Sequence, residues 1–359
     1  MLAHCGLMLG GAAGRLLSEA ALTVPDMSTQ PSSAAAPMGA GATALVEDAA
    51  LMENPAGVED PALTGDTTAA EEEPRRSSLS PSRASDFMTC PLLYRFRVID
   101  RLPQRPSSAA TRGTVVHSVL ERLFDLPAAE RTVQQASTML RPEWDRLLED
   151  EPEVGELFTD DAARDEWLEG ASGLLDAYFA LEDPQRLEPA ERELYVECDL
   201  DTGLRLRGYI DRLDVAPGGE LRVVDYKTGR APGEGFEAKA MFQMRFYALV
   251  LWRLRGQIPR VLQLLYLGSG EVLRYTPDEA DLLATERKVE AIWDAISRAT
   301  ERGDWRPSPS KLCDWCDHQA LCPAFGGTPP ELPVLPVPVV VQAPAADEKP
   351  SPHTPGDEL

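Results

Sequence analysis

The sequence predicts an α/β domain built on a mixed β-sheet with helices on its faces. Three segments with alternating apolar and polar residues, 191–201, 204–215 and 221–226, follow one another across tight turns, which indicates an antiparallel meander. A long apolar helix over 236–254 then leads to a nearly continuous apolar strand over 261–267. Because a strand, a crossover helix and another strand make a parallel connection, both kinds of pairing are expected in one sheet.

The folded domain is expected to span residues 78–326, between two tails. Residues 1–77 are rich in Ala, Pro and Ser and are acidic, and residues 327–359 are rich in Pro with an acidic end. Such segments cannot bury enough apolar surface to offset the entropy of ordering, so both are predicted to be disordered. Inside the domain, residues 128–182 have an acidic, helical pattern and predict a helical insert or cap.

The distribution of charge matters more than the net charge of −24. Local fields, not the total, steer a polyanion to a protein. Residues 75–124 carry nine basic and three acidic residues, whereas residues 125–203 carry six basic and 23 acidic ones. The basic segment is therefore compatible with a nucleic-acid partner, although an ordinary solvated surface would also explain it.

We expect a cytoplasmic protein with no membrane segment. No run of about 18 apolar residues occurs in the chain. The faintly apolar start lacks a basic region before it, so no secretory signal is predicted. Six cysteines in 359 residues do not indicate a disulfide scaffold.

Two helices are expected before the acidic insert. The first is predicted to begin at Ser82 and run to about residue 99, with Arg95 among interleaved Arg and Tyr residues that could grip phosphates. After a loop, the second is predicted over 112–124 and carries His117. A single histidine on an amphipathic helix is more often structural than a ligand, unless the helix passes close to an acidic site.

The hairpin over 208–229 carries the most informative residues. Asp211 lies on its first strand, and Asp225 and Lys227 lie on its second. Residues two apart on a strand point to the same face. Two carboxylates beside an ammonium group can hold a divalent cation and a water molecule, and a small number of oxygen ligands suits Mg²⁺ or Mn²⁺. The Asp-x-Lys pattern alone is also common on solvated strand faces.

A cysteine motif within residues 313–323 predicts a metal centre. Its members are Cys313, Cys316 and Cys322, in the spacing C-x2-C-x5-C. In a reducing compartment, three such cysteines need a metal explanation. Cys90 is the candidate for a fourth ligand, which would suit a [4Fe–4S] cluster, and His318 is the rival, which would suit Zn²⁺.

Taken in order, the motifs resemble those of the PD-(D/E)XK nuclease superfamily, and within it the RecB-type exonuclease branch with an iron–sulfur cluster. The AddB nuclease domain and CRISPR-associated iron–sulfur exonucleases belong to that branch. The motifs are Cys90, Gly113-x3-His117, Gly208-x2-Asp211, Asp225-Tyr226-Lys227, Gln243-x3-Tyr247 and the cysteines after residue 312. The resemblance covers about residues 80–326. It implies a restriction-endonuclease-like core and a metal-dependent DNA exonuclease in repair or recombination.

The resemblance also implies a role for each residue. The catalytic residues would be Asp211, Asp225 and Lys227. Mg²⁺ or Mn²⁺ would be held by His117, Asp211, Asp225 and the backbone carbonyl of Tyr226. The DNA strand would be positioned by Gln243 and Tyr247, together with Arg95 and Arg112. The cluster ligands would be Cys90, Cys313, Cys316 and Cys322.

Two departures from the resemblance affect these expectations. Asp225 stands where many relatives have glutamate, and the chain has no G-x4-GK[ST] phosphate loop of its own. The implied partners are therefore a DNA strand end and a separate helicase. The alternative from another class is a non-catalytic DNA-binding subunit stabilised by an iron–sulfur cluster or zinc, and the intact Asp211, Asp225 and Lys227 favour the enzyme.

Overall fold

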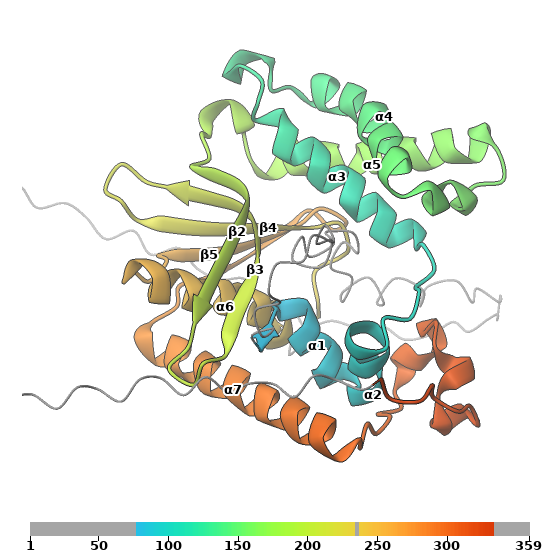
Figure 1. The fold of residues 1–359 in the computed structure, drawn as a ribbon. Helices are drawn as coiled ribbons and strands as arrows, with labels where there is room; N and C mark the ends of the chain where they lie inside the picture. The colour runs from blue at the N-terminus through green and yellow to red at the C-terminus, as the bar shows by residue number, and fades with distance from the viewer. Residues whose placement is uncertain (1–76, 234–236, 334–359) are drawn as a thin grey trace, which may run out of the picture. The chain divides into compact units, whose positions relative to one another are not determined.

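A computed structural model describes residues 77–233 and 237–333, and Figure 1 shows its fold. The strands are β1 (Ser78–Leu79), β2 (Glu191–Asp199), β3 (Arg205–Val215), β4 (Leu221–Lys227), β5 (Val261–Tyr266) and β6 (Glu271–Tyr275). The α-helices are α1 (Pro81–Thr89), α2 (Pro91–Tyr94), α3 (Ser108–Leu123), α4 (Val133–Asp150), α5 (Asp161–Leu181), α6 (Glu237–Arg255) and α7 (Glu279–Arg302). Apart from Ser77 and residues 327–333, the predicted tails lie outside the described residues.

The mixed six-stranded sheet is organised around β3. Antiparallel β2 pairs along one side of β3, while on the other side β1 pairs in parallel with its start and β4 pairs antiparallel with its end. β4 and β5 are parallel and are joined by α6, and β6 adds an antiparallel edge. The predicted α/β class, the meander and the mixed sheet are confirmed. The sequence reading missed β1 and β6, which are a two-residue strand and a partly exposed one.

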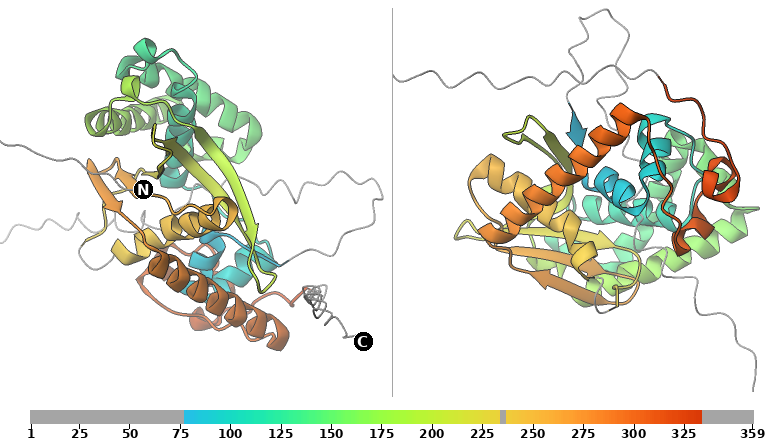
Figure 2. Two further views of the ribbon diagram at one scale, coloured as in Figure 1. Left: turned by 90° about the vertical axis from the view of Figure 1, so that its left-hand side faces the viewer. Right: turned by 90° about the horizontal axis from the view of Figure 1, so that it is seen from below.

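Helices cover both faces of the sheet, with α3, α4 and α5 above it and α1, α6 and α7 below it in Figure 1. Along β4, Val223 lies in the core formed with α6 and α7, whereas Val224 and Tyr226 lie in the core formed with α3, α4 and α5. The right-hand view of Figure 2, seen from below, shows α7 in orange running diagonally across the molecule. Residues 128–182 therefore share in covering one face of the sheet together with α3, and Trp144 and Leu175 are buried there.

The expected single helix from Ser82 to residue 99 is wrong, because the chain breaks at Cys90. Ser80 caps α1, its side-chain oxygen accepting a hydrogen bond from the Arg83 N–H at 3.3 Å. Pro91 follows Cys90, and a residue before proline is pushed out of the helical region. Cys90 accordingly has φ −161° and ψ 115°. The break takes Cys90 out of the helix, and the chain continues through α2 into a π-helical turn over Arg95–Ile99.

The helix that carries His117 also begins earlier than expected. Ser107 caps α3, its side-chain oxygen accepting from the Ala110 N–H at 3.3 Å. Residues 108–111, which were predicted to belong to the preceding loop, are thus helical. Of the helices in the described ranges, none is both long and apolar enough to cross a membrane.

Candidate active site

The predicted catalytic pair lies on β4, against α6. The Lys227 Nζ is 2.7 Å from Asp225 Oδ2 and donates to Gln243 Oε1 at 3.0 Å. Gln243 Nε2 in turn donates to Asp225 Oδ1 at 2.9 Å. The three side chains thus close a ring of polar contacts around a carboxylate that is only 1% exposed. Tyr247, one turn further along α6, accepts from Gln243 Nε2 at 3.3 Å.

His117 reaches the backbone of β4 from α3. Its Nε2 lies 2.9 Å from the carbonyl oxygen of Tyr226. Because a carbonyl can only accept, Nε2 is the donor. On the other side of the same residue, Asp211 Oδ2 accepts from the Tyr226 N–H at 2.9 Å and lies 3.4 Å from His117 Nδ1. The structure therefore brings these predicted residues together around one stretch of backbone.

The sequence reading missed Glu193. One ligand atom each from His117, Glu193 and Asp211 lies within 4.8 Å of the others. The β2–β3 register explains this, because Arg192 pairs with Arg212 and Leu194 with Ile210, which sets Glu193 opposite Asp211. Segment 191–201 holds several acidic residues, and nothing in the sequence marks Glu193 among them until the register is known.

Burial and mutual repulsion perturb the pKa of two carboxyl groups of this site, Glu193 and Asp225. The pKa of Glu193 is raised to about 8, first by burial and then by the charges of Asp211, Glu121 and Asp225. The pKa of Asp225 is raised to about 6, first by burial and then by Asp211, while the Lys227 ammonium acts in the opposite direction. Groups with strongly perturbed pKa values in one cluster are typical of functional sites.

A buried polar network anchors Tyr226 on the opposite face of β4. Its hydroxyl accepts from Arg212 Nη1 at 2.8 Å. Arg212 is fully buried and lies 2.9 Å from a Glu182 oxygen and 3.1 Å from an Asp214 oxygen. The Tyr226 ring also stands edge-on to Tyr178. Since His117 and Asp211 both bond to the Tyr226 backbone, this network helps to fix their positions.

Arg95 and Arg112, whose role in positioning DNA stays a prediction, both contact other residues of the domain. Arg95 is 6% exposed, its Nε lies 2.9 Å from Asp100 Oδ2, and its guanidinium donates to the Pro330 carbonyl. The Arg112 Cζ lies 5.6 Å from the centre of the Trp167 ring, and burial lowers the pKa of the guanidinium. Both side chains are therefore engaged in packing within the domain.

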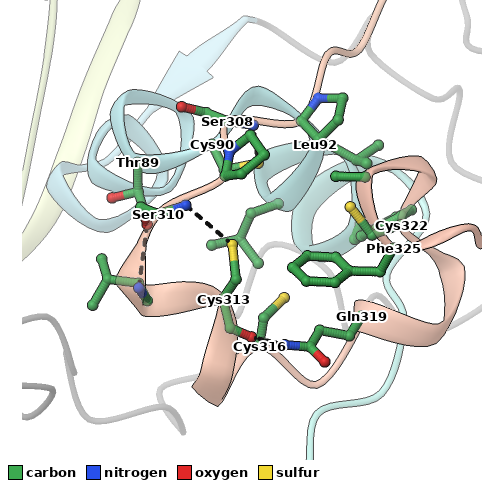
Figure 3. A pocket seen from close by; sticks show the side chains of 16 residues that line it. Thr89, Cys90, Leu92, Ser308, Ser310, Cys313, Cys316, Gln319, Cys322 and Phe325 are labelled. Carbon is green, nitrogen blue, oxygen red and sulfur yellow. Dashed lines mark hydrogen bonds between the residues drawn. The ribbon is translucent and has the colours of Figure 1, made fainter.

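The four predicted cluster cysteines line one pocket, shown in Figure 3. They are Cys90, Cys313, Cys316 and Cys322. Cys90 Sγ accepts from the Ser308 N–H at 3.3 Å, although the two residues are 218 positions apart. Cys313 Sγ accepts from the Ser310 N–H at 3.3 Å. Backbone N–H groups directed at sulfur stabilise thiolate ligands and tune the metal they hold.

His318, the rival fourth ligand, is placed differently. It does not belong to the residues that line the pocket. Its ring packs edge-on against Phe96, with 5.3 Å between the ring centres, and it is 4% exposed. The pocket thus collects the four thiols but not the His318 ring. Cys198, on β2, lies outside this group, and burial raises its pKa to about 11.

The chain is similar to two phage proteins and to a solved structure. The Gene 69 protein of Mycobacterium phage D29 is 29% identical over 281 residues, covering 68% of this chain and 96% of the phage protein. The Gene 69 protein of Mycobacterium phage L5 is 25% identical over 288 residues, with the same two coverages of 68% and 96%. A solved structure named "Putative exonuclease" from Eubacterium rectale is similar with a TM-score of 0.46 and 16% identity, over 71% of this chain and 94% of that one.

The family model for the PD-(D/E)XK nuclease superfamily matches residues 78–323, which is well over half of the chain. The matched range contains the whole sheet, the Asp225 and Lys227 pair, and His117. The mixed sheet with helices on both faces agrees with a restriction-endonuclease-like core. The chain belongs to the PD-(D/E)XK nuclease superfamily.

Proposed function

We propose that this protein is a divalent-cation-dependent exonuclease that hydrolyses DNA phosphodiester bonds from a strand end. The observation that carries the proposal is the buried Asp225 and Lys227 pair beside the His117 and Asp211 contacts to Tyr226. Membership of a nuclease superfamily supports the reaction class. The resemblance to RecB-type enzymes supports a place in DNA repair or recombination beside a separate helicase.

The donor atoms fit Mg²⁺ or Mn²⁺. Carboxylate oxygens suit both ions, and imidazole nitrogen is accepted by transition metals such as Mn²⁺. His117, Asp211 and Asp225 would hold the ion, and the Tyr226 carbonyl has a second lone pair beyond the one that His117 occupies. When bound, the ion polarises the scissile phosphate and lowers the pKa of a coordinated water molecule.

Lys227 would act beside that water. Its ammonium group is held at two points, by Asp225 Oδ2 and Gln243 Oε1, so its position is fixed before substrate arrives. A preorganised positive charge offsets the negative charge that develops on the phosphate in the transition state. Gln243 and Tyr247 stand next to this pair, which supports their proposed role in positioning the DNA strand.

We also propose that Cys90, Cys313, Cys316 and Cys322 bind a [4Fe–4S] cluster. The shared pocket and the two N–H···S contacts support it. A cluster would have no redox step to perform in hydrolysis. Its role would be to tie Cys90 to the C-terminal part of the domain, because closing so long a loop stabilises the folded state.

Anaerobic purification distinguishes the cluster from zinc bound to the same thiols. We expect a brown protein with an absorption band at about 400 nm and about four iron atoms per chain. A colourless protein containing stoichiometric zinc would overturn the iron–sulfur assignment and leave the nuclease proposal standing.

Cleavage of end-labelled DNA tests the nuclease proposal. Single- and double-stranded substrates are incubated with Mg²⁺ or Mn²⁺ and either wild-type protein or Asp225→Ala. We expect shortening of the labelled strand by the wild type and a loss of at least about a hundredfold in the variant. DNA binding without cleavage by the wild type would instead support the non-catalytic subunit.

A further inference from the structure

We propose that Glu193 is a direct ligand of the divalent cation, acting with His117 and Asp211. The inference rests on the proposed nuclease function and deepens it, since it adds a residue that the sequence motifs do not contain. One ligand atom from each of the three residues lies within 4.8 Å of the other two, a spacing that a single ion can bridge.

The contacts of Asp225 explain why a further carboxylate is needed. Both Asp225 oxygens are already engaged, Oδ1 by Gln243 Nε2 and Oδ2 by Lys227 Nζ. In contrast, the Glu193 carboxylate makes no hydrogen bond or ion pair with the residues that the structure describes. Glu193 is therefore free to ligate an ion without first breaking a contact, whereas Asp225 has to share its oxygens.

The orientation of the His117 ring points to the same place. Its Nε2 donates to the Tyr226 carbonyl, so in the neutral ring Nδ1 carries a lone pair. That nitrogen belongs to a side chain that is 9% exposed, and it lies 3.4 Å from Asp211 Oδ2, which is long for a hydrogen bond. A cation between the two atoms could be bound by both of them.

The backbone at Glu193 holds the carboxylate in this position at a cost. Its φ is 44°, in the left-handed region that side chains other than glycine rarely adopt, although it lies within β2. Glycine accepts this conformation without strain. Replacement by glycine therefore removes the carboxylate without adding backbone strain. The variant separates loss of a metal ligand from loss of the fold.

Mn²⁺ binding to the full-length protein in the absence of DNA tests the inference. Free Mn²⁺ is followed by electron paramagnetic resonance during titration of the wild type, Glu193→Gln and Glu191→Gln. Glu191 is the matched control because it is exposed on the same strand, two residues earlier. We expect Glu193→Gln to weaken Mn²⁺ binding at least tenfold and Glu191→Gln to bind like the wild type. Equal affinity of Glu193→Gln and wild type would overturn the inference.

Two further arms keep the outcomes distinct. If Glu193→Gln does not fold, Glu193→Gly is titrated instead, with the same expected loss of affinity and with thermal stability of the metal-free protein unchanged or higher. DNA cleavage by the wild type is measured in parallel with Mn²⁺. A wild type that cleaves DNA while the Glu193 variants bind Mn²⁺ normally defeats only the role of Glu193. A wild type that neither binds Mn²⁺ nor cleaves DNA defeats the proposed function as well.

Discussion

Gly208 and Tyr247 approach so closely that no side chain fits at position 208. A Cβ added there would lie 2.8 Å from Cε1 and 3.5 Å from the hydroxyl oxygen of Tyr247. The glycine of the Gly-x2-Asp motif thus allows α6 to bring Tyr247 and its partner Gln243 against β3 and β4. The glycine at position 208 is therefore a packing requirement of the active site.

We expect Gly208→Ala to displace the Tyr247 ring and with it Gln243. Overpacking of this kind costs about 1–3 kcal/mol of unfolding free energy, which urea denaturation measures, and DNA cleavage should fall in parallel. The control is Gly173→Ala in α5, where an added Cβ meets nothing within 4 Å and helix propensity should give a small gain. Equal stability of Gly208→Ala and wild type would contradict this packing account.

Removal of the Tyr226 hydroxyl should destabilise the domain without removing a metal ligand. Tyr226→Phe leaves the buried Arg212 without one of its acceptors, and an unsatisfied buried donor costs about 1–3 kcal/mol. Chemical denaturation of the variant is compared with that of Tyr209→Phe, on the neighbouring strand, which should be close to neutral. The account of the anchoring network fails if the two variants are equally stable.

Gln243→Ala should lower the rate of the chemical step more than it lowers stability. Gln243 bonds both Asp225 and Lys227, so its loss frees the pair to move. Misplacement of catalytic groups by about 1 Å costs roughly a hundredfold in rate. Single-turnover cleavage measures this loss, and Gln257→Ala, an exposed glutamine that donates to the Gly219 carbonyl, serves as the control. An unchanged single-turnover rate would show that Gln243 does not hold the pair.

Cys90 and Cys198 should differ in what they do for the metal centre. Cys90 lines the shared pocket, whereas Cys198 has its pKa raised to about 11 by burial, so almost none of it is thiolate near neutral pH. Cys90→Ser is expected to lose the bound metal and melt at a lower temperature, and Cys198→Ser to retain the metal. Metal analysis of the two purified variants measures this difference. Full metal content in Cys90→Ser would argue against the four-thiol site.

The fold class and the motif residues were accessible from the sequence because their signals are local. Alternating strands, tight turns and the Asp-x-Lys spacing predicted β2, β3 and β4, and the register then brought Asp211 next to the Tyr226 backbone. The break at Cys90 was also accessible, because Pro91 excludes the preceding residue from a helix. The prediction of one continuous helix from Ser82 left this effect of Pro91 out.

Contacts between distant segments could not be predicted in the same way. The place of Glu193 depends on the β2–β3 register and on an unusual φ, neither of which the composition of the strand reveals. The sequence gives Arg95 no visible partner, whereas the fold pairs its guanidinium with Asp100 and with the Pro330 carbonyl. A basic residue on a helix carries no local mark that separates these two outcomes.

The most direct measurement of the central claim is recovery of cleavage after removal of divalent cations. Protein treated with EDTA and dialysed is incubated with end-labelled DNA before and after addition of Mn²⁺, using the wild type, Asp211→Asn and the exposed control Asp201→Asn. We predict no cleavage without the cation, and full recovery with Mn²⁺ for the wild type and Asp201→Asn but not for Asp211→Asn. Cleavage by the cation-free wild type, or full recovery in Asp211→Asn, would contradict the account.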